Sequence, residues 1–397
     1  MIVNFFSLSV IEVIAKLSPW ITLPYVTYII GLEKFGLVTF ADAFAAYFLT
    51  IVDYGFAFSA TRDVSKNREN KNKVKEIYSN VFSAKIILLL VAVIIYFSLI
   101  KFIPSLNSNF ELYLFSFFVV IANLFYPKYL FQGLEDMKFI AIFDVSTQIL
   151  RVIAIFLFLK NADDYILVPL FTGGSAILAG VFATCFIYIK YSIYPKAVPV
   201  KTAFSELKNG FNIFINQLLP NLYTNTSTVL LKIICSESVV GIYGAAQKVI
   251  GIGVSLLSVL SKVFFPRIAK SNTRFNNYKK LISIFSVIIV IGYLLLSKPL
   301  FHVLFTSEFY EGIPLTYIMA IGFFGLALYD CYGINGLIQI GKSDKLVRST
   351  LYASLIGLVS AFVLIYFFGA IGAAITITLT RILMGTGAFM FYNKKIF

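Results

Sequence analysis

The sequence predicts an all-α polytopic membrane protein. Of its 397 residues, 59% are hydrophobic and only 13% are charged, a balance that soluble domains do not show. Apolar stretches recur along the whole chain, and each is long enough for a transmembrane helix, which needs about 20 mostly apolar residues. The polar segments between these stretches are short, so we expect no soluble domain between them.

About twelve transmembrane helices are expected. The span Leu37 to Ala60 is followed directly by a basic loop that starts at Arg62, which places this loop in the cytoplasm. The sides of the other loops then follow by alternation. The predicted spans are Phe5 to Ile29, Leu37 to Ala60, Val81 to Ile103, Leu112 to Phe131, Phe139 to Leu159, Ile166 to Ile189, Phe211 to Ile234, Val239 to Phe265, Leu281 to Phe305, Pro314 to Ile340, Leu351 to Phe368 and Ala370 to Tyr392.

The charges of the loops orient these spans. Lys and Arg near the ends of a span stay in the cytoplasm. If the N-terminus is inside, nearly all Lys and Arg of the loops are cytoplasmic, and the outer loops contain only Lys34. We therefore expect both termini in the cytoplasm. The same bias explains most of the net charge of +14, so nucleic acid is not an expected partner.

A polar linker at residues 196–208 divides the chain into two predicted bundles of six helices, residues 1–195 and 209–397. A shift of 205 residues pairs Gly36 with Gly241 and Arg62 with Arg267. An even number of spans in each half implies parallel repeats, with a substrate site between the halves.

Four cations fall inside predicted spans: Lys16, Arg151, Lys248 and Arg381. An ionised group at the bilayer centre costs at least about 2.5–3.5 kcal/mol, so it should face a water-filled cavity or a partner. We expect a cationic lumen that attracts an anionic substrate group such as pyrophosphate, for which Arg offers bidentate geometry. Lys85 lies nearer a span end, where a long side chain can reach the headgroups.

Membrane acids offer partners or ion sites. Glu12 precedes Lys16 by four residues and Asp144 precedes Arg151 by seven, so each pair shares a helix face. Such pairs could equally be structural. The remaining candidates for a coupling H+ or Na+ are Asp42, Asp53 and Asp330.

Residues that interrupt helices are also expected along the substrate path. Pro24 falls inside the first span and Pro220 inside the seventh, where each would free a backbone carbonyl and kink the helix. Asn216 and Asn221 make the seventh span unusually polar. Helix breaks often line the path in transporters, although kinks also serve packing.

Catalysis and metal binding have little support. His302 is the only histidine, and the three cysteines lie far apart without metal-ligand spacing. We expect no metal, no cofactor and no enzymatic activity.

Several segments carry a resemblance to one family. They are Asp53-Tyr-Gly-Phe-Ala-Phe-Ser-Ala-Thr-Arg, Pro127-Lys-Tyr-Leu-Phe-Gln-Gly and Val240-Gly-Ile-Tyr-Gly-Ala-Ala-Gln-Lys. These segments resemble Wzx-type polysaccharide flippases of the multidrug/oligosaccharidyl-lipid/polysaccharide exporter superfamily, which also contains the MATE drug exporters. The resemblance covers nearly the whole chain and implies a V-shaped MATE-like transporter in a bacterial inner membrane.

The resemblance also implies a function and partners. Members move undecaprenyl-diphosphate-linked oligosaccharide repeat units to the outer face of the membrane, by alternating access driven by an H+ or Na+ gradient, for O-antigen or capsule assembly. A polysaccharide polymerase and chain-length proteins are the implied protein partners. Two alternatives stay open: an ion-coupled exporter of cationic drugs, which should have a net acidic central site, and a structural scaffold of a polysaccharide assembly complex.

Overall fold

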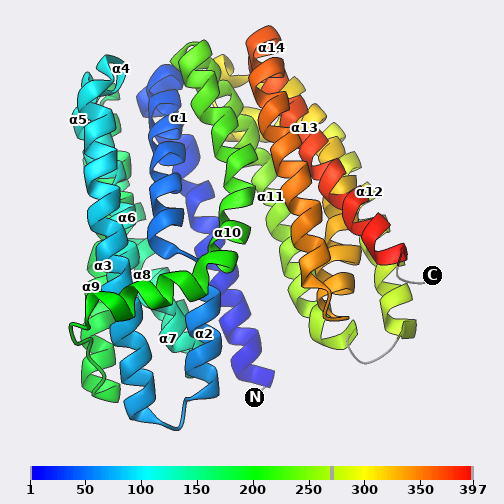
Figure 1. Ribbon diagram of the computed structural model, residues 1–397. Coiled ribbons are helices and arrows are strands. Elements are labelled where there is room, and N and C mark those ends of the chain that lie inside the picture. The colour runs from blue at the N-terminus through cyan, green and yellow to red at the C-terminus, as the bar shows by residue number, and fades with distance from the viewer. Residues whose placement is uncertain (1, 269–271, 395–397) are drawn as a thin grey trace. The chain divides into compact units, whose positions relative to one another are not determined.

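The computed structural model describes the backbone of residues 2–268 and 272–394 (Figure 1). Side chains are described over the same ranges except at positions 2–19, 212, 216, 220, 222, 262, 263, 265–268 and 272–274. The described residues form helices and no strand, and nine of their helical stretches are long and apolar enough to cross a membrane. The predicted all-α membrane fold is confirmed, and about twelve spans are compatible with it.

The structure orders the helices as α1 (Ile2–Asp53), α2 (Phe56–Lys66), α3 (Lys71–Phe102), α4 (Pro104–Asn107), α5 (Phe110–Ser116), α6 (Phe118–Phe125), α7 (Lys128–Gly133), α8 (Met137–Phe158), η1 (Ala162–Ile166), α9 (Leu167–Tyr191), α10 (Val200–Ile234), α11 (Glu237–Ile268), α12 (Asn272–Leu304), η2 (Ser307–Phe309), α13 (Gly312–Leu328), the π-helix η3 (Tyr329–Ile338) and α14 (Ser343–Asn393).

Two of these helices each hold two predicted spans. In α1 the backbone leaves the helical conformation at Gly31, with φ 70° and ψ 178°. In α14 it does so at Gly369, with φ 52° and ψ −126°. Positive φ is the conformation that glycine adopts without a Cβ clash. A single glycine therefore separates the first span from the second, and another separates the eleventh from the twelfth.

Two predicted spans, the second and the fourth, are themselves interrupted. The second is not continuous, because α1 ends at Asp53 and α2 begins only after Tyr54 and Gly55, whose φ values are 49° and 77°. The fourth is divided among α5, α6 and α7, and the break between α6 and α7 contains Pro127. Proline has no N–H to continue the helix, and positive φ ends one, so the chain changes direction at both places.

The chain divides into two compact units. The first contains the residues up to Ile30 and Ala41–Leu218, and the second contains Gly31–Phe40 and the chain from Leu219 onward. The first is held by an aromatic and aliphatic cluster that includes Phe56, Tyr78 and Tyr129. The domain boundaries predicted from the linker stay a prediction.

In the second unit, the residues just before the second predicted span pack closely against α11 and η2. Phe35 contacts Phe309 edge to face, with ring centroids 5.5 Å apart. A Cβ on Gly36 would overlap the carbonyl oxygen of Glu237, and a Cβ on Gly241 would lie 3.4 Å from the Gly36 nitrogen. The two glycines that the 205-residue shift pairs therefore lie against each other.

Substituting Gly36 with alanine should destabilise the protein by about 1–3 kcal/mol, because the new methyl group meets backbone that cannot rotate away. Gly174, in α9, has open space around its Cβ position, so Gly174→Ala should be neutral or stabilising by up to about 1 kcal/mol. Thermal unfolding in detergent measures both variants. Equal unfolding temperatures for the two would contradict the close approach.

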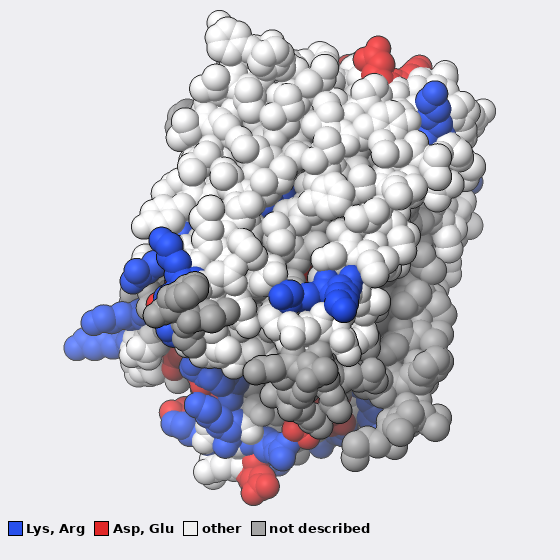
Figure 2. All heavy atoms as spheres, turned by 90° about the vertical axis from the view of Figure 1, so that its right-hand side faces the viewer, with Lys and Arg blue, Asp and Glu red and all other residues white. Residues whose placement is uncertain are grey.

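Many large apolar side chains are exposed on the surface. Large side chains such as Ile94, Phe367 and Val303 are exposed, as lipid contact requires. Figure 2 shows a broad uncharged surface on one face, with Lys and Arg gathered toward one end. This distribution is that of a multi-pass membrane protein.

Candidate functional site

The two helix breaks of the first unit surround a buried ion pair. Asp53 is the last residue of α1, and Lys85 comes from α3. The Lys85 ammonium lies 3.7 Å from Asp53 Oδ1, and the side chains are only 4% and 14% exposed. Our expectation that the Lys85 side chain reaches the lipid headgroups is therefore wrong.

Pro127 explains why Lys85 is held there. In a continuous helix the carbonyl of Asn123 would accept from the amide of residue 127, which proline lacks. Instead, the Lys85 ammonium donates a hydrogen bond to this carbonyl oxygen at 3.2 Å and another to the Asn123 side-chain oxygen at 2.7 Å. The freed carbonyl and the carboxylate together compensate a charge that would be costly to bury alone.

Asp53 is held by two further side chains. Asn123 donates its amide nitrogen to Asp53 Oδ1 at 3.4 Å, and Gln217 of α10 donates to Oδ2 at 2.8 Å. A cavity of about 230 Å³ adjoins the pair and is also lined by Tyr126 and Lys128. Four helices thus converge on one carboxylate beside a space large enough for several water molecules.

The spacing of Asp144 and Arg151 on α8 suggested that they pair, but they do not. Asp144 forms an ion pair with Lys128 of α7 at 2.8 Å. Two residues on one helix face seven positions apart are about 10 Å apart along the axis. The break at Pro127 brings Lys128 closer to the carboxylate than Arg151 is.

Arg151 lies half-buried in α8, and its Nε and Nη2 atoms have no hydrogen-bond acceptor among the described residues. Asp42 is the acid whose charge acts on it. A buried guanidinium with unused donors is poorly compensated, and an anion is the group that would satisfy it.

In the second unit, Arg381 of α14 is only 8% exposed. Three tyrosines lie near its guanidinium: Tyr223, Tyr243 and Tyr293, from α10, α11 and α12. Over the described side chains, no carboxylate forms an ion pair with it, and its Nη1 atom has no acceptor. Gly322 of α13 leaves room for its side chain, since a Cβ there would lie 3.1 Å from Arg381 Cδ.

Asp330 is buried on the π-helix η3. Tyr278 of α12 donates its hydroxyl to Asp330 Oδ2, and Asn335 donates to the same oxygen at 3.2 Å. Asn335 also donates to Ser261 of α11 at 3.0 Å. π-Helical turns occur often at functional sites, and here the wider turn places residues five apart on one face.

Replacing Tyr278 with phenylalanine should destabilise the protein by about 1.5–3 kcal/mol, because a charged acceptor in a buried site loses a donor. Tyr366 is 70% exposed, so Tyr366→Phe serves as the control and should leave unfolding unchanged. Chemical denaturation monitored by fluorescence compares them. An unchanged midpoint for Tyr278→Phe would show that this bond contributes no stability.

The other predicted site residues are placed as follows. Lys248 of α11 is exposed, and no described side chain forms an ion pair with it. The backbone dihedrals stay helical through Pro24, and the non-helical residue of α1 is Gly31. A role of Pro24 in the substrate path stays a prediction. Asn221 accepts from Asn225 of its own helix at 2.8 Å. The side chains of Glu12, Lys16, Asn216 and Pro220 lie outside the described residues.

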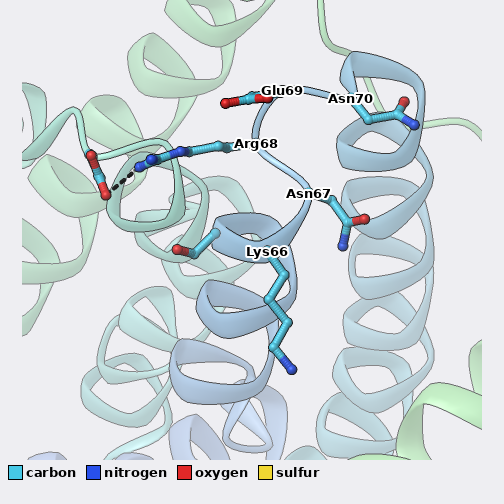
Figure 3. Close-up of a pocket in the computed structure, with 7 residues that line it drawn as sticks. Lys66, Asn67, Arg68, Glu69 and Asn70 are labelled. Atoms are coloured by element: carbon cyan, nitrogen blue, oxygen red, sulfur yellow. Dashed lines mark ion pairs between the residues drawn. The ribbon is translucent and has the colours of Figure 1, made fainter.

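A second hollow lies at the loop between α2 and α3, which the charge pattern predicts to be cytoplasmic. Lys66, Asn67 and Arg68 line it, and Figure 3 shows Arg68 turned toward the carboxylate with which it pairs, that of Glu135. Its side chains are mostly exposed, so ion pairs there contribute little stability.

Nearby, Asp136 lies between α7 and α8, outside the spans. Burial alone would raise the pKa of Asp136, but hydrogen bonds from Tyr191 and Lys190 outweigh it and hold this pKa below its ordinary value. Asp136 therefore stays ionised and ties α9 to the start of α8 at neutral pH.

The family of the chain follows from comparison with known proteins. A family model described as polysaccharide biosynthesis protein matches residues 1–272. The chain belongs to this family. Two relatives of the chain carry the name "Putative O-antigen transporter". The one from Escherichia coli strain K12 is 26% identical over 99% of this chain and 97% of its own length. That of Shigella dysenteriae is 25% identical over 93% and 94%.

Solved structures with the same fold come from two groups of transporters. A structure described as lipid II flippase MurJ, inward closed conformation, matches with a TM-score of 0.80 and 16% identity, over 98% of this chain and 87% of that one. An inward-facing multidrug resistance MATE transporter of the MOP superfamily matches with a TM-score of 0.72 and 15% identity, over 98% of both chains. The predicted resemblance and MATE-like fold class are confirmed.

Sequence reasoning missed the groups that compensate the buried charges. Asp53 and Arg381 were candidates, whereas Lys85, Asn123 and the three tyrosines around Arg381 were not. One signal was available in the sequence. Pro127 lies four residues after Asn123 and has no N–H, so the Asn123 carbonyl lacks its usual helical donor. The tyrosines come from three helices far apart in sequence, and no spacing rule connects them.

Proposed function

We propose that this protein moves undecaprenyl-diphosphate-linked oligosaccharide repeat units from the cytoplasmic to the outer face of a bacterial inner membrane, for O-antigen or capsular polysaccharide assembly. The observation that carries the proposal is the pair of membrane-buried arginines, Arg151 and Arg381, whose guanidinium nitrogens include atoms without an acceptor among the described residues. The family and the names of the two relatives support a polysaccharide precursor as the substrate.

The chemistry of the headgroup fits these cations. A diphosphate presents several oxygens with negative charge, and a guanidinium donates to two of them at once. Arg381 and Arg151 are proposed to donate to this group when the site opens, with Lys248 and Lys16 adding positive charge along the path. The prenyl chain stays in lipid, because transferring it through a polar path would cost about 0.8 kcal/mol per CH₂.

Transport in this proposal proceeds by alternating access and is driven by an H+ or Na+ gradient. The candidate acids are Asp42, Asp53 and Asp330. Both termini lie in the cytoplasm, and the protein works beside a polysaccharide polymerase and chain-length proteins. It catalyses no covalent reaction, as the transporter names of its relatives and structural neighbours suggest.

A drug exporter with the same fold is the competing function. Export of cationic drugs calls for unpaired acids in the membrane. Among the described buried charges, two arginines have nitrogen atoms without an acceptor. By contrast, Asp53 and Asp330 each accept hydrogen bonds from two or more donors. This balance favours an anionic substrate.

The proposal is tested with a strain that lacks the gene. Mass spectrometry of its lipid-linked oligosaccharides should reveal accumulation of a complete undecaprenyl-diphosphate repeat unit, with loss of surface polysaccharide and recovery of both on complementation. If lipid intermediates and polymer stay unchanged while drug sensitivity rises, the protein is a drug exporter.

A further inference from the structure

We propose that an apolar groove between α11 and α12 of the second unit binds the prenyl chain of the lipid-linked substrate while Arg381 binds its diphosphate. This inference rests on the proposed flippase function and adds to it a binding site for the lipid part of the substrate. It is carried by Tyr293, which lies near the Arg381 guanidinium and also lines the groove.

The groove lies on the surface of the second unit and has a volume of about 240 Å³. Its lining includes Leu256 of α11 and Ile288 and Leu296 of α12, each of which is more than half exposed. The described lining contains no charged side chain. An exposed apolar hollow on a membrane protein faces hydrocarbon rather than water. A hydrocarbon chain is therefore the ligand that the chemistry of the groove fits.

Two glycines shape the groove. A Cβ on Gly292 of α12 would have no atom within 4 Å, so the missing side chain leaves open space there. A Cβ on Gly253 of α11 would lie 2.8 Å from the Tyr293 hydroxyl oxygen, so a glycine is needed for the tyrosine to approach this helix. The Tyr293 hydroxyl accepts from the Gly253 N–H at 2.8 Å and donates to the Val249 carbonyl at 2.9 Å. Tyr293 is therefore fixed at the buried side of the groove.

Tyr293 also connects the groove to Arg381. It is one of the three tyrosines near the guanidinium, and its ring stacks on that of Phe323 of α13 with centroids 5.5 Å apart. The residue before Phe323 is Gly322, whose Cβ position lies 3.1 Å from Arg381 Cδ. The groove and the buried cation are therefore neighbours, as the two parts of one amphipathic ligand require.

The depth of Arg381 in the membrane indicates which lipid would use both parts. Arg381 lies twelve residues after Gly369 and twelve before Asn393, the last residue of α14, so it is about 18 Å along the helix from each. The hydrocarbon core is about 30 Å thick. A resident phospholipid keeps its phosphate at the membrane surface, because an ionised group near the bilayer centre is costly. A phosphate at Arg381 with its chain in the groove therefore belongs to a lipid whose headgroup is crossing the membrane.

The groove acts by positioning the chain. Lipid tails are as apolar as the groove, so a chain that moves from the bilayer into it gains mainly close packing. Each contact between apolar atoms is weak, but a long chain makes many of them. A chain held beside Tyr293 keeps its diphosphate near Arg381, so the groove should lower the substrate concentration that transport needs.

Photo-crosslinking to undecaprenyl diphosphate, which has the chain and the diphosphate without the sugar, tests the groove in liposomes of phosphatidylethanolamine and phosphatidylglycerol. The photoreactive amino acid p-benzoylphenylalanine replaces either Leu296, which lines the groove, or Leu295, which is exposed on the same helix outside it. Prenyl adducts at position 296 should exceed those at position 295 at least about fivefold, and Arg381→Met should reduce them by a similar factor. Equal prenyl adducts at both positions would show that the groove holds only bulk lipid.

Filling the groove gives a second test and separates this proposal from the flippase assignment. Gly292→Phe should raise the substrate concentration for half-maximal flipping at least about fivefold. Gly174→Phe is the control, because a Cβ there also meets open space, and it should flip normally. If the wild type and Gly292→Phe flip oligosaccharide equally well, the flippase stands and the groove is wrong. If prenyl adducts form at position 296 as expected but the wild type moves no oligosaccharide, the groove stands and the proposed function is wrong.

Discussion

Replacing Lys85 with methionine should reduce the stability of the folded protein by about 3–5 kcal/mol, the usual effect of breaking a buried ion pair from one side. The variant leaves the Asp53 carboxylate ionised without its cation and leaves the Asn123 carbonyl without its donor. Because folded proteins are stable by only about 5–15 kcal/mol, this loss should be visible as low yield in detergent. Thermal unfolding followed by size-exclusion chromatography measures it.

Two variants control for this result. Lys128→Met removes a partly exposed ammonium from the same cavity, and its loss should cost no more than about 1 kcal/mol. The double variant D53N/K85M removes both charges, so it should recover most of the stability lost in Lys85→Met. A Lys85→Met protein as stable as the wild type would mean that Lys85 reaches water or lipid headgroups, as the sequence first suggested.

Arg381→Met should slow transport strongly without destabilising the protein. The methionine fills a similar space. The change leaves no carboxylate unpaired among the described residues, because none of them forms an ion pair with Arg381. Stability should therefore stay the same or rise. Loss of a charge-assisted hydrogen bond to the diphosphate, worth about 1.5–3 kcal/mol, should lower the transport rate at least about tenfold.

Arg348 provides the matched control, since it lies exposed on the same helix. Arg348→Met should leave surface polysaccharide at the level of the wild type. Arg381→Lys should give an intermediate rate, because a lysine keeps the charge but cannot donate to two oxygens in the planar geometry of arginine. Normal transport by Arg381→Met at normal protein levels would exclude Arg381 from the path.

The fold could be predicted because it depends on properties that are local in sequence. Apolar length located the spans, and Gly369 lies in the single position between the two spans predicted on either side of it. The helix breaks were predicted less well. A proline such as Pro24 can be accommodated in a membrane helix, whereas Gly31 and the pair Tyr54 and Gly55 adopt positive φ, which composition does not reveal.

The site was harder to predict, because its contacts connect distant segments. Asp144 was assigned to Arg151 from spacing on one helix, yet the chain supplies Lys128 from the neighbouring helix at 2.8 Å. Lys85 was placed at an interface from its sequence position, whereas a proline in another helix creates its acceptor. Buried charges choose partners in three dimensions, and one sequence contains only part of that information.

The proposed transport depends most directly on a buried guanidinium that binds a lipid-linked diphosphate during transfer across the membrane. Liposomes containing an undecaprenyl-diphosphate-linked oligosaccharide and purified protein allow this to be measured, with a membrane-impermeant reagent or lectin that detects the headgroup on the outside. We expect the wild type and Arg348→Met to equilibrate the headgroup across the membrane under a proton gradient and Arg381→Met to fail. Headgroup exposure with Arg381→Met that equals the wild-type level and exceeds the level without protein would contradict this role of the buried guanidinium.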